Sequence, residues 1–86
     1  MLGGVLTIKD TMTLDIERSW WKYAGVKEAV VRELFSESLT RYYQRLNMLI
    51  DRPEALEYDA LLVRRLRRVR EARQAARGAR RAGFAV

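Results

Sequence analysis

The chain has 86 residues, a formal net charge of +6, and neither cysteine nor histidine. A chain of this length supports one small domain. The missing residue types exclude disulfides, Cys/His zinc sites, thiol nucleophiles and the commonest general base. The chain also lacks a Gly-rich phosphate-binding loop and a pair of acidic residues with the spacing of catalytic carboxylates. We therefore do not expect an enzyme, and we expect no cofactor and no bound metal.

Positive charge is concentrated at the C-terminal end. Residues 1–63 carry eight Lys and Arg against ten Asp and Glu, whereas residues 64–86 carry nine Arg against Glu71 alone, so the two parts have net charges of −2 and +8. No window of eighteen apolar residues occurs, so no membrane span and no membrane partner are expected. The first ten residues, MLGGVLTIKD, lack the pattern of a signal peptide. These features predict a cytoplasmic protein.

A first helix is predicted from about Thr13 to Ala24. Residues 1–12, which have little hydrophobic pattern, are predicted to form a flexible N-terminal arm. Gly25 is placed to end the helix in the position that glycine favours. The predicted apolar face consists of Leu14, Ile16, Trp20, Trp21, Tyr23 and Ala24.

Glu17 falls inside that apolar face. Because an isolated buried carboxylate is costly, this residue is expected to form an ion pair inside the protein. Arg32 and Arg41 are the expected cationic partners.

The segment from Lys27 to Ile50 reads as two short helices joined by a tight polar turn. In the first helix, Val30, Val31, Leu34 and Phe35 share one face. Ser36 and Glu37 interrupt the pattern, and Ser38 is a favourable N-cap for the second helix. The apolar stripe of the second helix consists of Leu39, Tyr42, Tyr43, Leu46, Leu49 and Ile50.

The polar side of this second helix resembles a recognition helix. Two helices joined by a turn of three or four residues form a helix-turn-helix, whose second helix reads the major groove. Arg can bond guanine with two parallel hydrogen bonds, and Gln or Asn can bond adenine in the same way. A plain solvated face is the equally weighted alternative. The candidate DNA-binding residues are Thr40, Arg41, Gln44, Arg45 and Asn47.

The last part of the chain predicts a short helical turn followed by a long helix. Pro53 suits a first helical position, and Leu56 and Tyr58 are expected to reach the core. Asp59 is a natural N-cap for a helix from residue 60 to about residue 77, with fraying expected at Gly78. The core stripe of this helix comprises Leu62, Leu66 and Val69, with Leu61 and Val63 at its margins.

Beyond Val69, this helix consists mainly of Ala and Arg, and residues 70–86 are predicted to project as a basic extension. Such an extension is expected to bind phosphates, because guanidinium groups fork onto them. A basic coiled coil that forms a homodimer and a solvated tail are the alternatives. The candidate phosphate-binding residues are Arg64, Arg67, Arg68, Arg70, Arg73, Arg77, Arg80 and Arg81.

Three segments carry a family resemblance: DIERSWWKYAGVKEAVVRELF, then S-x-T-R-Y-Y-Q-x-L-N-x-L-I-D-R-P-E-A-L, then LVRRLRRVREARQAARGARR. Over about residues 14–82 the chain resembles a small family of uncharacterised actinobacterial proteins. The resemblance implies a helix-turn-helix-like fold in a bacterial cytoplasm and implies no substrate. Family members carry Gly and then an apolar residue in the turn, where this chain has Ser36 and Glu37. That departure bears on the turn, because Gly tolerates a left-handed backbone better than Ser does.

The sequence therefore predicts an all-α fold, a three-helix helix-turn-helix domain over residues 13–69 with a long Arg-rich C-terminal helix. We expect a small protein that binds duplex DNA, regulates transcription and associates with the nucleoid. An interaction module that docks on RNA polymerase or the ribosome through its basic helix is the alternative.

Overall fold

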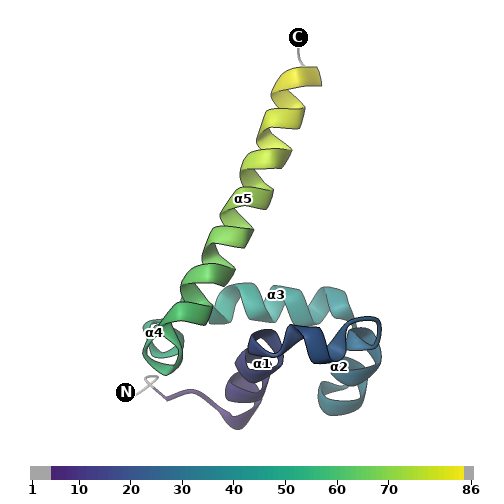
Figure 1. Cartoon of the computed structure of the whole chain (residues 1–86), viewed down its shortest axis with the longest axis vertical. Coiled ribbons are helices and arrows are strands. Elements are labelled where there is room, and N and C mark those ends of the chain that lie inside the picture. Colours follow the sequence, from purple (N-terminus) through teal and green to yellow (C-terminus); the bar gives the residue numbers. More distant parts are fainter. Residues whose placement is uncertain (1–4, 85–86) are drawn as a thin grey trace.

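The computed structural model describes residues 5–84, with side chains over residues 5–79. In this range the chain forms α1 (Ile8–Arg18), a 3-10 helix η1 (Trp20–Tyr23), α2 (Lys27–Phe35), α3 (Leu39–Leu49), α4 (Pro53–Tyr58) and α5 (Ala60–Phe84). The predicted all-α fold is confirmed. Residues 5–70 form a helical body, and residues 71–84 of α5 form an extension that projects away from it (Figure 1).

Helix α1 begins five residues before the predicted start at Thr13. The Thr7 side chain accepts a hydrogen bond from the Asp10 backbone N–H (3.1 Å), and the Asp10 carboxylate accepts one from the Thr7 N–H (3.0 Å). This reciprocal capping box satisfies two amide groups that would otherwise lack partners. The prediction of a flexible arm is therefore wrong for residues 8–12, and residues 1–4 lie outside the described part of the chain.

Helix α1 also ends earlier than predicted, at Arg18. Trp20 and Trp21 follow in η1 and are 55% and 59% exposed, so their assignment to the core is wrong. A continuous helix would separate residues 17 and 27 by about 15 Å. Instead, the Lys27 ammonium lies 2.6 Å from the Glu17 carboxylate, which requires the chain to reverse between them. Gly25, with φ of +84°, provides part of that reversal.

The core is built around α3, as its apolar stripe predicts. Buried Leu14 of α1 and Val31 of α2 lie on this core. Tyr58 was expected there, but it is 43% exposed and its hydroxyl donates to Asp15 at 3.0 Å. The remaining buried members of the core are Tyr42, Leu46, Leu49, Ile50, Ala55, Leu62 and Val63.

A three-residue turn joins α2 to α3. Ser36 adopts a left-handed conformation (φ 54°, ψ 37°), and its N–H donates to the Arg32 carbonyl at 2.9 Å. Ser38 caps α3, as predicted, by accepting a hydrogen bond from the Arg41 N–H at 3.2 Å. The tight turn therefore forms with Ser in place of Gly, at a conformational cost of about 1–2 kcal/mol.

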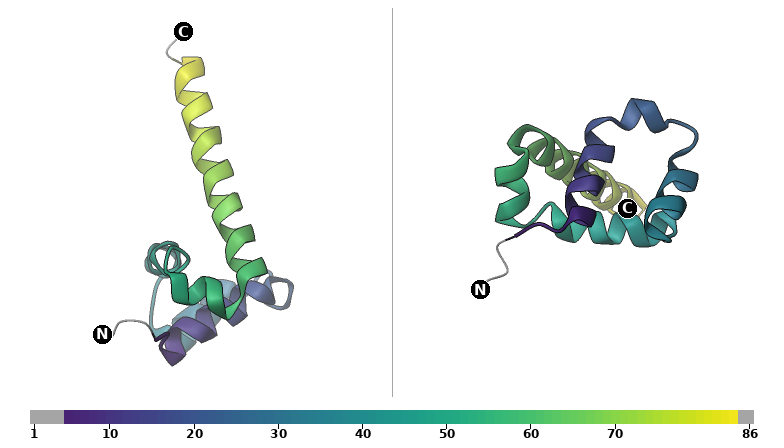
Figure 2. Two further views of the ribbon diagram at one scale, coloured as in Figure 1. Left: turned by 90° about the vertical axis from the view of Figure 1, so that its left-hand side faces the viewer. Right: turned by 90° about the horizontal axis from the view of Figure 1, so that it is seen from below.

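Among the described side chains of α5, the hydrogen bonds that fix the helix to the body come from its first half, up to Arg70. Asp59 caps it through the Leu62 N–H (3.2 Å), as predicted. The Arg67 guanidinium donates to the Ile50 carbonyl at 2.6 Å, next to the C-terminal end of α3. The helix does not end near residue 77: it passes through Gly78 and reaches Phe84, a length of 25 residues or about 37 Å. Figure 2 shows the extension standing clear of the other helices.

Candidate nucleic-acid interface

Four of the five predicted base-contacting residues lie on the solvent-exposed side of α3. Thr40, Arg41, Gln44 and Asn47 are exposed. The Arg41 guanidinium has no ion pair within the part of the chain that the structure describes. This side of α3 therefore has free hydrogen-bonding groups, as the sequence predicts.

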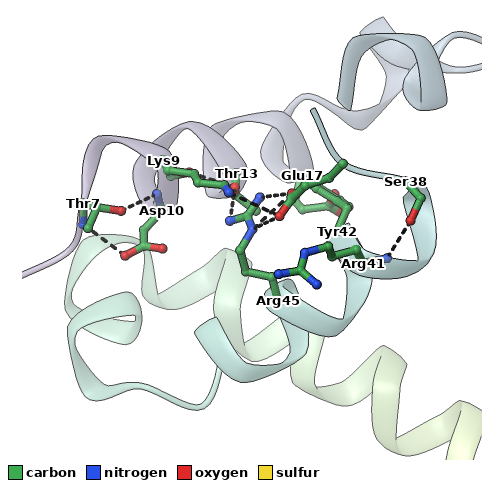
Figure 3. A network of polar contacts seen from close by, with 10 residues as sticks. Thr7, Lys9, Asp10, Thr13, Glu17, Ser38, Arg41, Tyr42 and Arg45 are labelled. Atoms are coloured by element: carbon green, nitrogen blue, oxygen red, sulfur yellow. Dashed lines mark hydrogen bonds and ion pairs between the residues drawn. The ribbon is translucent and has the colours of Figure 1, made fainter. Parts of the chain in front are cut away.

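Arg45, the fifth candidate, points into the protein instead. Its guanidinium binds the buried Glu37 carboxylate with contacts of 2.9 to 3.2 Å and also donates to the Thr13 hydroxyl at 2.9 Å (Figure 3). The same group lies 4.9 Å from the centre of the Phe35 ring. Only 21% of the Arg45 side chain is exposed, so the prediction that it faces outward is wrong.

Glu37 organises this contact from within the turn. Its carboxylate also lies 3.2 Å from the Lys9 ammonium, so it joins the turn to both α1 and α3. The hydrogen bonds from Arg45 lower the pKa of Glu37, against the opposing effect of burial. The negative charge of Glu37 is thus compensated inside the fold by Arg45 and Lys9.

Glu17 is buried and ion-paired, as predicted, but its partner is neither Arg32 nor Arg41. It binds the Lys27 ammonium at 2.6 Å and accepts a hydrogen bond from the Tyr42 hydroxyl at 2.6 Å. Burial, followed by the charge of Glu17, raises the pKa of Tyr42. Burial alone would lower the pKa of Lys27, but its contacts with Glu17 and Tyr43 outweigh that effect and raise it.

The arginines of α5 divide into partnered and unpartnered groups. Arg70 forms two hydrogen bonds with the Asp51 carboxylate (2.7 and 3.0 Å), which lower the pKa of Asp51. Arg65 donates to the Glu17 carbonyl at 3.4 Å, and Arg67 is bound to Ile50 as described above. The expectation that Arg70 stands clear of the body is therefore wrong.

Four other arginines of this helix have no bonded partner within the described side chains: Arg64, Arg68, Arg73 and Arg77. Arg80 and Arg81, also predicted to bind phosphates, lie in α5, but their side chains are outside the described part.

A groove forms where α5 leaves α3. Tyr43 and Asn47 of α3 line one side, and Arg73 and Arg77 of α5 line the other. Residues 64 and 68 are each nine positions, or about two and a half helical turns, before residues 73 and 77. Arg64 and Arg68 therefore lie on the opposite side of α5, away from the groove. Figure 1 shows that α5 leaves α3 at a wide angle, and residues of both helices line the groove.

The electrostatic character of this groove is positive. Lys27, Arg70, Arg73 and Arg77 line it, and Glu17 is the single carboxylate among the described lining residues. Glu17 is held by Lys27, as described above. The groove thus presents guanidinium groups to solvent beside the exposed face of α3, which is an arrangement suited to a polyanion.

Comparison with protein families gives a match, over residues 5–78, to the family described as "Protein of unknown function (DUF3263)". The chain belongs to this DUF3263 family. Searches of curated proteins and of solved structures each gave no match.

In this DUF3263 member, the sequence reasoning missed several groove residues. Tyr43 was assigned to the core stripe, but it is 37% exposed and borders the groove. Lys27 and Gln74 received no role. Gln74 lies four residues after Arg70 and three before Arg77 on the same predicted helix, so helical spacing could have indicated it. Within residues 5–84, no helix combines the length and the apolar character required to cross a membrane.

Proposed function

We propose that the protein binds duplex DNA through one concave surface, composed of the exposed side of α3 and the groove-facing arginines of α5. The observation that carries this proposal is the position of Arg73 and Arg77, which face Tyr43 and Asn47 across a positively charged groove. Such a surface can hold a phosphate backbone and place a helix beside base edges at the same time.

The two sides of this surface have different tasks. Arg41, Gln44 and Asn47 carry the donors and acceptors that read guanine or adenine in the major groove. Arg73 and Arg77 hold phosphates, and their contribution does not depend on sequence. Arg45 has no part in the interface, because it is engaged with Glu37. A protein of this kind regulates transcription or shapes the nucleoid.

The test is duplex affinity measured at several salt concentrations, with R73Q/R77Q compared with R64Q/R68Q. Each double variant removes two unpartnered arginines, four residues apart, from α5. For the groove variant, the slope of log affinity against log salt should become less negative by about 2, because each phosphate contact contributes about 0.9. The variant on the opposite side should change it little. Equal changes in both variants would contradict a defined interface.

Sequence preference is tested separately, by selecting bound duplexes from a random pool. If Gln44 or Arg41 reads a base, replacing it with Ala should remove about 1–3 kcal/mol of preference at one base pair. Affinity for random duplex should stay close to that of the wild type. A wild-type protein that enriches no sequence would instead indicate an architectural role.

A second candidate function is docking on RNA polymerase or the ribosome, here through η1 and not through the basic helix that the sequence suggested. The observation that favours it is the exposure of Trp20 and Trp21 in η1, because tryptophan is enriched where proteins bind one another. Co-purification after nuclease treatment, abolished by W20A/W21A and unaffected by R73Q/R77Q, would support this candidate. Co-purification that disappears with nuclease would support nucleic-acid binding instead.

A further inference from the structure

The groove between α3 and α5 is also suited to a small ligand. It has a volume of about 240 Å³, which is below the range of about 300–1,000 Å³ typical of pockets for drug-sized molecules. A ligand smaller than a typical drug molecule fits such a space. Its polar lining contains Lys27, Asn47, Arg70, Arg73, Gln74 and Arg77.

The charges around the groove indicate what that ligand would be. Four cations and one carboxylate among the described lining residues give a net charge of +3. Lys27 compensates Glu17, and Arg70 compensates Asp51 at the outer edge. Arg73 and Arg77 are left without a bonded acid within the described side chains. The groove therefore has spare positive charge at two neighbouring turns of one helix.

The neutral groups in the lining match the same chemistry. The amides of Asn47 and Gln74 and the hydroxyl of Tyr43 can all donate hydrogen bonds. A ligand with several negatively charged acceptor oxygens in a row would use these donors together with the two guanidinium groups. Arginine binds phosphate, like carboxylate, with two parallel hydrogen bonds.

We propose that this groove binds a free oligophosphate, a short chain of linked phosphates that is either inorganic or the phosphate arm of a nucleotide. The ligand lies between Arg73 and Arg77 on one side and Tyr43 and Asn47 on the other. Binding of this ligand goes beyond duplex binding and does not require it. If the duplex uses the same arginines, the oligophosphate competes with it and regulates it.

Calorimetry with inorganic tripolyphosphate at constant ionic strength tests the site. The wild-type protein should bind, and R73Q/R77Q should bind at least about tenfold more weakly, because two charge-assisted contacts are lost. R64Q/R68Q, with the same charge removed from the opposite side of α5, should change the affinity by less than about threefold, as expected for a distant screened charge. An equal loss in both variants, or no binding by the wild-type protein, would overturn the proposal. Circular dichroism of both variants shows whether α5 remains helical.

Two further titrations distinguish the source of the phosphates. ATP without metal, compared with tripolyphosphate, reports whether an attached nucleoside adds affinity. Binding of both ligands, with the Arg73 and Arg77 dependence described above, supports the site. If the protein bound single phosphate ions as tightly as tripolyphosphate, the proposal would be overturned, because the linked phosphates would then not be recognised as a chain.

A failure of the proposed duplex binding would not overturn the oligophosphate site. Duplex affinity measured without tripolyphosphate tests only the duplex interface. Tripolyphosphate binding by a protein that ignores duplex DNA would leave the oligophosphate site standing. Duplex binding by a protein that ignores tripolyphosphate would leave only the duplex interface standing.

Discussion

The body and the extension use charged residues in opposite ways. In the body, Glu17 and Glu37 are buried, and each carboxylate is bonded to a cation from another element. In the extension, Arg73 and Arg77 face a groove without a bonded acid among the described side chains. An arginine near a carboxylate thus stabilises the fold, whereas an arginine without one remains available to bind a ligand. The number of arginines alone therefore does not define a binding surface.

The largest expected effect comes from removing the side chain at the centre of the body. Tyr42 is fully buried, stacks on Phe35 with ring centres 6.2 Å apart, and donates to Glu17. Tyr42→Ala should lower the free energy of unfolding by about 3–5 kcal/mol, through the cavity and the lost packing. That is a large share of the stability of a small domain. Urea denaturation followed by circular dichroism measures it.

Trp20→Ala is the matched control for this prediction. Trp20 is also a large aromatic residue, but more than half of its side chain is exposed. Its replacement should change stability by less than about 1 kcal/mol, as for other surface substitutions. If Trp20→Ala destabilised the protein as much as Tyr42→Ala, η1 would have to pack against the core.

The next largest effect concerns the contact between Glu37 and Arg45. Arg45→Ala leaves a buried carboxylate with Lys9 as its remaining cationic partner. Because Arg45 is still one-fifth exposed, the expected loss is about 2–3 kcal/mol, below that of a fully buried pair. Arg41→Ala, four residues away on the solvated side of α3, should cost less than about 0.5 kcal/mol. Thermal or urea unfolding of the two variants compares them.

The pH dependence of stability gives an independent measure of the same contact. The pKa of Glu37 is lowered in the folded protein, chiefly by Arg45. Its charged form therefore stabilises the fold above the ordinary glutamate pKa of 4.5, and this contribution is lost as the pH falls through the lowered value. In Arg45→Ala the acid-dependent loss should be smaller than in the wild type. An unchanged pH profile would show that Arg45 does not set the charge of Glu37.

The contact between Glu37 and Arg45 shows what the sequence could and could not predict. The stripe of α3 apart from Tyr43, the caps at Ser38 and Asp59, and the start of α4 at Pro53 are local patterns, and the structure confirms them. Glu37 and Arg45 are eight residues apart and meet only because the turn directs Glu37 inward. No periodicity of a single helix contains that information.

The errors at the two ends of α1 have different causes. At the beginning, the signal was present, because Thr7 and Asp10 have the spacing of a capping box. At the end, the spacing of Trp20 and Tyr23 imitates a helical face, and the contact of Lys27 with Glu17 requires the chain to turn instead. A tertiary contact thus overrides a local pattern.

A smaller effect on stability is expected from deleting residues 71–86. The deletion removes the extension but keeps Arg70, which fixes α5 to Asp51. The free energy of unfolding should fall by less than about 1 kcal/mol, because residues 71–79 are exposed. Affinity for duplex DNA should fall steeply at low salt, since four arginines and one glutamate are removed. A deletion that unfolds the body would mean that the extension packs, for example against a second copy.

The smallest expected effect is a gain in stability, and it tests how the turn between α2 and α3 is held. Ser36 has a left-handed backbone, which costs a non-glycine residue about 1–2 kcal/mol. Glycine removes that cost but gives the unfolded chain more freedom, which offsets about 0.5–1 kcal/mol. Ser36→Gly should therefore raise the free energy of unfolding by about 0.5–1 kcal/mol.

Ser38→Ala, two positions later, is the matched control for that turn. It should act in the opposite direction and cost about 1 kcal/mol, because the Arg41 N–H loses its acceptor. Measured by urea denaturation, a neutral or destabilising Ser36→Gly would show that contacts of Ser36 compensate its backbone. A gain in stability would instead mean that Ser36 itself does not favour the turn. We then attribute the left-handed backbone of Ser36 to the next residue, Glu37, whose carboxylate is bonded to Arg45 and Lys9. These ion pairs would hold a non-glycine residue in a conformation that glycine usually adopts.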